Sequence, residues 1–299
     1  PKAPSLLYYG DVDGSGVERL IEAKPDKSSQ LVGVFLPVRG KSCSSAAIPS
    51  LNKKFPTFDS FAKSKLDEIY APDRLASAQR FAANNFESGL LINDGSGKFS
   101  WQALPRLAQA APSYGVVTGD FNGDGYPDLC AAQNLYSREP ETGLWRGGVG
   151  LFLAGTGNPD QLLDFIPAGQ SGFVIDGDGK ALVLTDLNND GSPDFIASEN
   201  NDFPVVIKTQ PKKAQATFAI RLQGPKGNPQ GIGATIRVSY DQGRTATSEI
   251  HGGSGYLSHS SPVAFFASPG AREVTVTWPD QTKTTVPCEN SKVIKINHP

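Results

Sequence analysis

Two short segments of the chain repeat one spacing of oxygen-bearing side chains. They run from Asp120 to Asp128 and from Asp186 to Asp194, with such side chains at positions 1, 3, 5 and 9 and a glycine at position 6. The glycine allows the backbone to turn sharply, and position 7 can offer a backbone carbonyl. Oxygen ligands at alternating positions around such a turn are typical of a six- to eight-coordinate Ca²⁺. The sequence therefore predicts two calcium loops.

The alternative interpretation is an ordinary surface turn, because Asn, Asp and Gly are common turn residues. Two observations favour calcium: three carboxylates in each loop would repel one another without a cation, and both copies continue into Pro-Asp and a short apolar run. An EF-hand is excluded, because it requires a glutamate at position 12 and flanking helices. Here position 12 is Ala131 or Ala197, and the flanks have the composition of strands.

A third and weaker copy begins at Asp11 and Asp13. Its position 5 is Ser15 and its position 9 is Arg19, which brings a positive charge to the place of the last carboxylate. We expect this loop to keep its turn and to lose the metal, unless Glu18 or Glu22 restores the missing ligand.

Composition limits the classes of protein. The net charge is −2 over 299 residues, without a basic run, so a nucleic-acid surface is not indicated. No apolar stretch approaches the roughly 20 residues of a membrane span. The 32 glycines and 23 prolines suit many short strands joined by turns.

The chain begins at Pro1 and contains no methionine, so we expect a processed or partial chain. Cys130 is expected to be buried, whereas Cys43 and Cys288 could pair.

The order of patterns along the chain predicts a repeat of strand, acidic loop, strand and hairpin. The two good loops begin 66 residues apart, and hairpin patterns occur at 89–101 and 150–165. Between about 50 and 86, apolar residues recur every three or four positions, which predicts an inserted helical pair whose aromatic stripe faces the core. Repeats of several tens of residues, each a small antiparallel sheet, are typical of a propeller.

At this level the residues resemble known families. The acidic loops are similar to the FG-GAP (VCBS-type) repeats of integrin-α-like β-propellers. The segments 227–234, 252–258 and 274–280, which include Gly-Ser-Gly-Tyr-Leu-Ser and Trp-Pro-Asp, resemble the ASPIC/UnbV module of cartilage-acidic-protein-like proteins. The resemblance implies a mainly β fold, with propeller blades over 1–214, the helical insertion at about 50–86, and a small antiparallel β sandwich or barrel over 215–299.

The resemblance also implies the ligands of two Ca²⁺ ions, by matching each loop to the family motif. They would be Asp120, Asn122, Asp124, Asp128 and the Tyr126 carbonyl in the first loop, and Asp186, Asn188, Asp190, Asp194 and the Ser192 carbonyl in the second. A third ion at Asp11 and Asp13 is not expected. About three units fit before residue 215, and a closed propeller has roughly four to eight blades. We therefore expect the C-terminal part of a larger protein, which associates with its remaining blades or with another chain.

The C-terminal segment lacks the common catalytic patterns. The glycines at 252–255 lack the Lys-Ser/Thr of a phosphate loop, and no Gly-x-Ser-x-Gly nucleophile elbow occurs there. His251 and His259 are eight residues apart and are interpreted as hydrogen-bonded loop residues. The sequence therefore predicts no catalytic residue and no organic cofactor.

The favoured function is a calcium-binding, non-catalytic scaffold for protein interaction or cell adhesion that is secreted, periplasmic or on the cell surface. The alternative is a carbohydrate-active protein, either a sugar dehydratase or lyase relative or a lectin. Its candidate sugar-binding residues are Trp101, Trp145, Tyr136, Glu139 and Glu141, of which the aromatic ones could equally belong to the core. In the last module, Trp278 is expected in the core, and Tyr256 is expected to contact the propeller or a partner.

Overall fold

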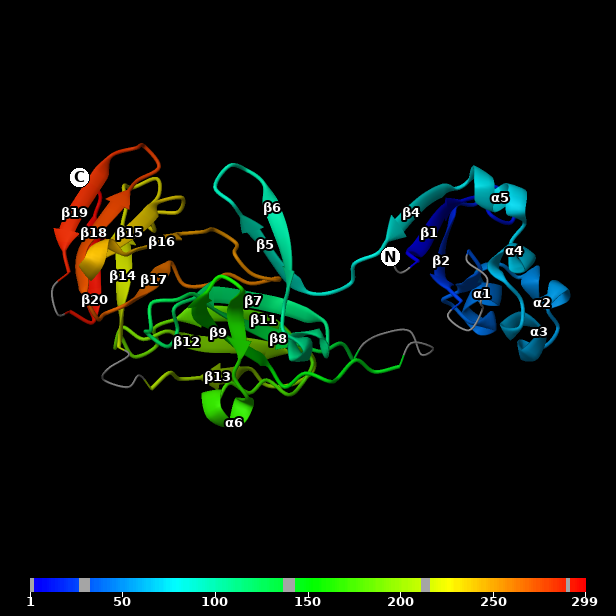
Figure 1. Cartoon of the computed structure of the whole chain (residues 1–299), viewed down its shortest axis with the longest axis horizontal. Helices are drawn as coiled ribbons and strands as arrows, with labels where there is room; N and C mark the ends of the chain where they lie inside the picture. Colours follow the sequence, from blue (N-terminus) through cyan, green and yellow to red (C-terminus); the bar gives the residue numbers. More distant parts are fainter. Residues whose placement is uncertain (1–2, 27–32, 137–142, 211–215, 289–290) are drawn as a thin grey trace. The chain divides into compact units, whose positions relative to one another are not determined.

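The computed structural model describes residues 3–26, 33–136, 143–210, 216–288 and 291–299. The fold is mainly β, built from several antiparallel sheets with short helices between some of them (Figure 1). The chain divides into two compact units, one of Pro1–Glu87 with Glu139–Gly143 and one of Ser88–Arg138 with Leu144–Pro299. This division does not bear on the predicted boundary at residue 214, which stays a prediction.

The first unit contains one four-stranded sheet and five short helices. The strand order is β3-β2-β1-β4, and the strands are β1 (Ser5–Gly10), β2 (Arg19–Pro25), β3 (Phe35–Pro37) and β4 (Gln79–Ala83). The helices are α1 (Lys41–Ala47), α2 (Leu51–Lys54), α3 (Phe58–Ala62), α4 (Leu66–Ile69) and α5 (Pro72–Ser77). Their apolar residues form the unit's core together with Leu6, Ile21 and Ala23 of the sheet.

The helical insertion is where the sequence predicts but is differently divided. Instead of one helical pair over 50–86, five helices of four to seven residues occupy 41–77, and 79–83 is strand β4. Proline cannot donate a helical hydrogen bond and disfavours a helical residue before it, and Pro49, Pro56 and Pro72 interrupt the pattern. Phe55 and Phe61 pack edge to face in the core, as predicted, with ring centroids 5.6 Å apart.

Two further sheets contain the good acidic loops. One has the order β10-β9-β8-β7 and the other β11-β12-β13. The strands are β7 (Ser113–Gly119), β8 (Asp128–Gln133), β9 (Leu151–Asn158), β10 (Gln161–Phe165), β11 (Gly179–Thr185), β12 (Asp194–Glu199) and β13 (Val205–Ile207). The predicted hairpins are present, one as β9–β10 and the other as β5 (Gly89–Asn93) with β6 (Phe99–Ala103). A 3-10 turn (η1, Arg106–Gln109) and the short helix α6 (Ala168–Ser171) complete this part.

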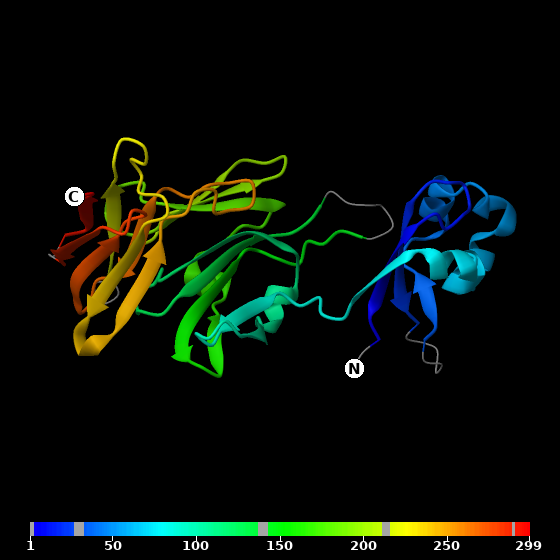
Figure 2. The ribbon, with the colours of Figure 1, turned by 90° about the horizontal axis from the view of Figure 1, so that it is seen from above.

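The two blade sheets share a core, and Figure 2 shows them side by side in green. Phe195 packs edge to face on Phe121, at 5.1 Å between ring centroids, and on Phe173, at 5.3 Å. Cys130 is fully buried there, as predicted. Strands β7 and β11 approach so closely at Gly115 that a Cβ at this position would lie 2.4 Å from the backbone nitrogen of Leu182. The arrangement is consistent with part of a propeller.

The C-terminal module is a β sandwich. One sheet has the order β17-β14-β20 and the other β16-β15-β18-β19. The strands are β14 (Thr217–Gln223), β15 (Thr235–Tyr240), β16 (Thr245–Glu249), β17 (Val263–Ala267), β18 (Ala271–Thr277), β19 (Lys283–Pro287) and β20 (Val293–Asn297), and the 3-10 turn η4 (Asp241–Gly243) precedes β16. The sandwich is not purely antiparallel, because β20 pairs in parallel with β14.

The module's core confirms the prediction for Trp278. Its side chain is 1% exposed and packs edge to face on His298, with ring centroids 5.0 Å apart. The indole nitrogen donates a 2.9 Å hydrogen bond to Thr284 Oγ1, so the polar end of this buried ring has a partner. Tyr256 contacts the blade, as predicted, since its ring lies 5.0 Å from that of Tyr114 on β7.

Candidate metal loops and the adjacent cleft

Each good acidic loop connects the two strands of one antiparallel pair. The loop that begins at Asp120 lies between β7 and β8, and the loop that begins at Asp186 lies between β11 and β12. The predicted order of strand, loop and strand is therefore present twice. Because both strands are fixed by pairing and by the shared core, the ends of each loop are held in place.

In the first loop the side-chain oxygens of positions 1, 3 and 5 fold back onto the loop's own backbone. Asp120 accepts the N–H groups of Gly123 and Gly125, each at 2.8 Å. Asn122 Oδ1 accepts Asp124 N–H at 2.8 Å, and Asp124 Oδ1 accepts Tyr126 N–H at 2.8 Å. Gly125 has a φ of 93°, in the left-handed region that glycine adopts without strain. These bonds gather the three side chains around one turn.

The second loop repeats this geometry. Asp186 accepts the N–H groups of Asp190 at 3.0 Å and Gly191 at 3.3 Å, and Asp190 Oδ1 accepts Ser192 N–H at 2.9 Å. In both loops the amide at position 3 donates to the carboxylate at position 5, from Asn122 to Asp124 at 2.8 Å and from Asn188 to Asp190 at 2.9 Å. The repeat seen in the sequence is thus a repeat in three dimensions.

The carboxylate at position 9 has a role that the sequence does not reveal. Asp128 accepts Phe121 N–H at the start of its loop and Gly155 N–H on β9, both at 2.8 Å. Asp194 likewise accepts Leu187 N–H at 2.9 Å and Thr209 N–H at 3.1 Å. Both aspartates are buried. Each one therefore ties the start of its loop to a more distant segment.

Burial makes the ionised carboxylates of the first loop costly. It raises the pKa of Asp120 to about 6, with the negative charge of Asp124 adding to the effect and hydrogen bonds from the loop N–H groups opposing it. Burial likewise raises the pKa of Asp128 to about 7. In the second loop burial acts on Asp190 too, but hydrogen bonds from Ser192 and Asn188 and the charge of Lys292 outweigh it and lower its pKa. A cation near the first loop would favour the ionised forms.

The donor set at positions 1, 3 and 5 suits a hard divalent cation, because every side chain there offers an oxygen. At position 7, the backbone carbonyls would come from the half-exposed Tyr126 and the buried Ser192. Among the described residues no group of three or more His, Cys, Asp or Glu side chains is gathered for metal binding. The third carboxylate of each loop accepts a backbone N–H from a segment outside the loop. Calcium at these loops stays a prediction.

Two positive charges lie beside the carboxylates of the degenerate third loop, one from the loop itself and one from helix α5. Arg19 Nε lies 3.2 Å from Asp13 Oδ2, and Arg74 Nη1 lies 3.7 Å from Asp11 Oδ2. The two glutamates that could have restored a ligand point elsewhere, because Glu18 accepts from the Tyr9 hydroxyl and Glu22 pairs with Arg39 at 2.7 Å.

We expect the third loop to bind no Ca²⁺, because two guanidinium groups already compensate its carboxylates. Metal counting on the calcium-saturated, dialysed protein should give at most two ions per chain. Replacement of Asp13 by alanine should leave that number unchanged, whereas a loss of one ion would contradict the prediction.

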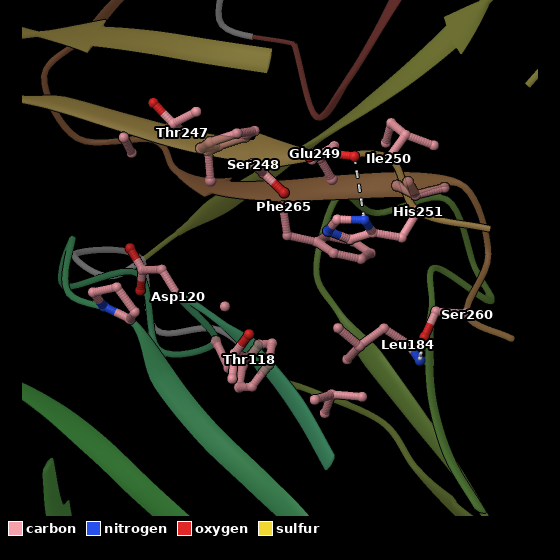
Figure 3. Close-up of a pocket in the computed structure, with 18 of the residues that line it drawn as sticks. Thr118, Asp120, Leu184, Thr247, Ser248, Glu249, Ile250, His251, Ser260 and Phe265 are labelled. Atoms are coloured by element: carbon pink, nitrogen blue, oxygen red, sulfur yellow. Dashed lines mark hydrogen bonds and ion pairs between the residues drawn. The ribbon is translucent and has the colours of Figure 1, made fainter. Parts of the chain in front are cut away.

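A cleft of about 520 Å³ separates blade strands β7 and β11 from the C-terminal module (Figure 3). Its walls carry hydroxyl groups, Asp120 and the pair formed by Glu249 and His251, whose Oε1 and Nδ1 atoms are 3.4 Å apart. Ser260 Oγ accepts Leu184 N–H at 3.1 Å and so joins the module to the blade. His259 Nδ1 accepts Gly253 N–H at 3.0 Å, which confirms its interpretation as a hydrogen-bonded loop residue.

The candidate sugar-binding aromatics are exposed, so they do not belong to the core. Trp101 is 45% exposed, Trp145 49% and Tyr136 38%. Trp145 forms a backbone bridge with Leu135, which is the residue before Tyr136. Glu139 and Glu141 lie outside the described residues.

Comparison with known proteins identifies the two kinds of module. A family model described as an FG-GAP-like repeat matches residues 80–131, and one described as ASPIC and UnbV matches residues 224–298. The chain therefore combines an FG-GAP-like repeat with an ASPIC/UnbV module, as the sequence predicts. The first match includes the loop that begins at Asp120, and the loop that begins at Asp186 lies between the two matched ranges.

The chain is similar to human Cartilage acidic protein 1. The two are 24% identical over 212 residues, which are 69% of this chain and 31% of the relative. The chain thus spans less than a third of the length of this relative. Within the described residues, no helix is long and apolar enough to cross a membrane.

Proposed function

We propose that this chain is an extracellular, non-catalytic interaction scaffold whose blades are stabilised by Ca²⁺ at the loops beginning at Asp120 and Asp186. The FG-GAP-like repeat, the ASPIC/UnbV module and the similarity to Cartilage acidic protein 1 support an interaction role outside the cell. Within that role, cell adhesion is the form of interaction we propose. The single observation that supports calcium most is that, in both blades, the N–H of position 6 donates to the aspartate at position 1 and the N–H of position 7 donates to the aspartate at position 5.

The ion would be held by Asp120, Asn122, Asp124 and the Tyr126 carbonyl in the first loop, and by Asp186, Asn188, Asp190 and the Ser192 carbonyl in the second. Asp128 and Asp194 would join these ligands through oxygens that also accept N–H groups. Bound calcium would supply positive charge between the loop carboxylates. The chain's own residues position the loop, because the position-9 aspartates and the strand pairs fix both of its ends.

Removal of calcium is expected to lower the stability of the blades. A ligand that binds only the folded state adds about 2.7 kcal/mol at a concentration one hundred times its Kd. A chelator should therefore lower the melting temperature, and Asp124→Ala and Asp190→Ala should each reduce that effect. Differential scanning calorimetry with and without chelator measures it.

Asp94→Ala provides the matched control. Asp94 also accepts N–H groups within a glycine-containing turn, between β5 and β6, but it lies outside the acidic loops. This variant should respond to chelator as the wild type does. An identical melting temperature with and without chelator in the wild type would refute the calcium part of the proposal.

The exposure of Trp101, Trp145 and Tyr136 favours a lectin as the second candidate function. Exposed aromatic faces can stack on sugar rings, whereas buried ones cannot. A glycan array, probed with and without chelator, distinguishes this candidate from a protein-binding scaffold. Specific glycan binding that Trp101→Ala and Trp145→Ala abolish would support the lectin.

A further inference from the structure

Two arginines of the C-terminal module reach the two good acidic loops, and they contact them differently. Arg244 precedes β16, and its Nη1 donates a 2.8 Å hydrogen bond to the backbone carbonyl of Gly125 in the first loop. Arg221 lies on β14, and its Nη2 donates a 3.0 Å hydrogen bond to Asn189 Oδ1 in the second loop. One arginine therefore contacts a neutral backbone group, and the other contacts a side chain beside a carboxylate.

The carboxylate beside Arg221 is that of Asp186, at position 1 of the second loop. The same Nη2 atom lies 3.9 Å from Asp186 Oδ2, and the Asp186 side chain is 0% exposed. A buried negative charge that is shielded from water interacts more strongly with a nearby cation than an exposed one does. In the first loop, no lysine or arginine of the described residues forms an ion pair with Asp120, Asp124 or Asp128.

The module holds Arg221 in this place through its backbone. Thr217, at the start of β14, donates from Oγ1 to the Gly191 carbonyl of the second loop at 2.9 Å. A Cβ on Gly191 would lie 2.2 Å from the Lys292 carbonyl, so the chain before β20 packs directly on the same loop. Because β14 and β20 are paired, the guanidinium group is carried by a fixed sheet.

In the third loop, two arginines lie beside the carboxylates instead of one. There Arg19 and Arg74 both lie beside loop carboxylates, and the position-9 aspartate has been replaced. The loops thus form a series in which no arginine, one arginine or two arginines pair with the carboxylates.

We propose that Arg221 acts as a built-in cation of the second loop, so that Ca²⁺ binds the first loop more tightly than the second. This inference rests on the proposed function, because it concerns the same two loops.

The physical basis is competition between positive charges. A guanidinium group near Asp186 neutralises part of the charge that attracts the ion, and it repels a divalent cation in the same loop. Arg244 also brings a positive charge to the first loop, but it donates to a backbone carbonyl and forms no ion pair with a loop carboxylate, so it neutralises none of the ligands there. The expected difference in Ca²⁺ affinity between the loops is about tenfold, since the Arg221 side chain is partly exposed and water screens part of the effect.

The test measures Ca²⁺ binding by isothermal titration calorimetry to one loop at a time. In Asp124→Ala protein the second loop is observed, and in Asp190→Ala protein the first. Arg221→Gln should tighten binding to the second loop about tenfold and leave the first loop unchanged. Arg221→Lys also removes the planar guanidinium group but keeps the positive charge, so Ca²⁺ binding to the second loop should stay weak. Arg244→Gln is the matched control and should not tighten binding to the second loop.

Asn189→Gly gives an independent variant that leaves Arg221 in place. Asn189 has a φ of 56°, which glycine adopts without strain, so this change removes the hydrogen bond to Arg221 without disturbing the backbone. Because the Arg221 charge stays beside Asp186, binding to the second loop should remain as weak as in the wild type. Equal affinity of the second loop in the wild-type and Arg221→Gln backgrounds would overturn the inference while calcium binding itself stands. No heat of binding in either single-loop background would overturn both proposals.

Discussion

Replacement of Trp278 by alanine is expected to lower the free energy of unfolding of the C-terminal module by about 3–5 kcal/mol, the usual cost of deleting a buried aromatic side chain. The indole is almost entirely buried, packs against His298, and lies close to Gly231, where a Cβ would be 3.3 Å from Trp278 Cζ3. The substitution would leave a cavity between the two sheets and would leave Thr284 Oγ1 without its donor. Chemical denaturation, followed by circular dichroism, measures the change.

Trp145→Ala is the matched control, because it deletes the same side chain from an exposed position. Its free energy of unfolding should change by no more than about 0.5 kcal/mol. If Trp278→Ala proved as mild as this control, the tryptophan would not be an anchor of the sandwich core, and the orientation of the segment after β18 would be wrong.

Asp178→Ala is expected to destabilise the blades by about 3 kcal/mol, because it removes a buried carboxylate and leaves the largely covered Lys180 ammonium without its partner. Asp178 is buried and pairs with Lys180 Nζ at 2.6 Å, while Asn200 Nδ2 donates to its other oxygen at 3.0 Å. Lys180 also donates to the Asn134 carbonyl at 2.8 Å and lies 3.9 Å from the centre of the Tyr114 ring. The substitution therefore disturbs the network that joins the end of β8 to β11.

Asp176→Ala, two residues away, is the control, since Asp176 is exposed and, of its groups, the backbone carbonyl accepts a hydrogen bond, from Tyr136.

The pH dependence gives a second check on Asp178. Burial acts to raise its pKa, but hydrogen bonds from Lys180 and Asn200 and the Lys180 charge outweigh it, so the pKa is lowered. The stabilisation is then present above the unfolded-state pKa of about 3.9 and is lost as the pH falls through the folded-state value. The difference between wild type and Asp178→Ala should be constant near neutral pH and shrink in acid. A difference that grew in acid would contradict this assignment.

The parts of the fold that depend on neighbouring residues could be predicted from the sequence. The acidic loops, their flanking strands and the hairpin at 89–101 follow from spacing and turn residues, and all are present. Apolar periodicity indicates the place of the helical insertion but not its division into five short helices, because the periodicity continues across prolines that interrupt the backbone bonds. The parallel pairing of β20 with β14 joins segments too far apart in the chain for any local pattern to indicate.

The candidate site likewise has one part that the sequence predicts and one part that it does not. Its oxygen donors at positions 1, 3 and 5 are local, whereas the partners that define its environment are not. Gly155 is 27 residues from Asp128, and Asn189 is 32 residues from Arg221. No pattern within nine residues carries that information. The sequence alone reveals the positive charge at Arg19, because this residue lies inside the loop that it affects.

The double use of the last aspartate in each loop has a consequence for how such repeats should be recognised. Without an ion, Asp128 already binds a backbone N–H of β9, and Asp194 binds one just after β13. Selection on folding alone would then preserve an acidic residue at this position in a blade that has lost its metal. A motif search that counts aspartates would score such a blade as metallated. The charge of the groups facing position 1, which only a three-dimensional comparison supplies, would be the better criterion for sorting occupied loops from vestigial ones.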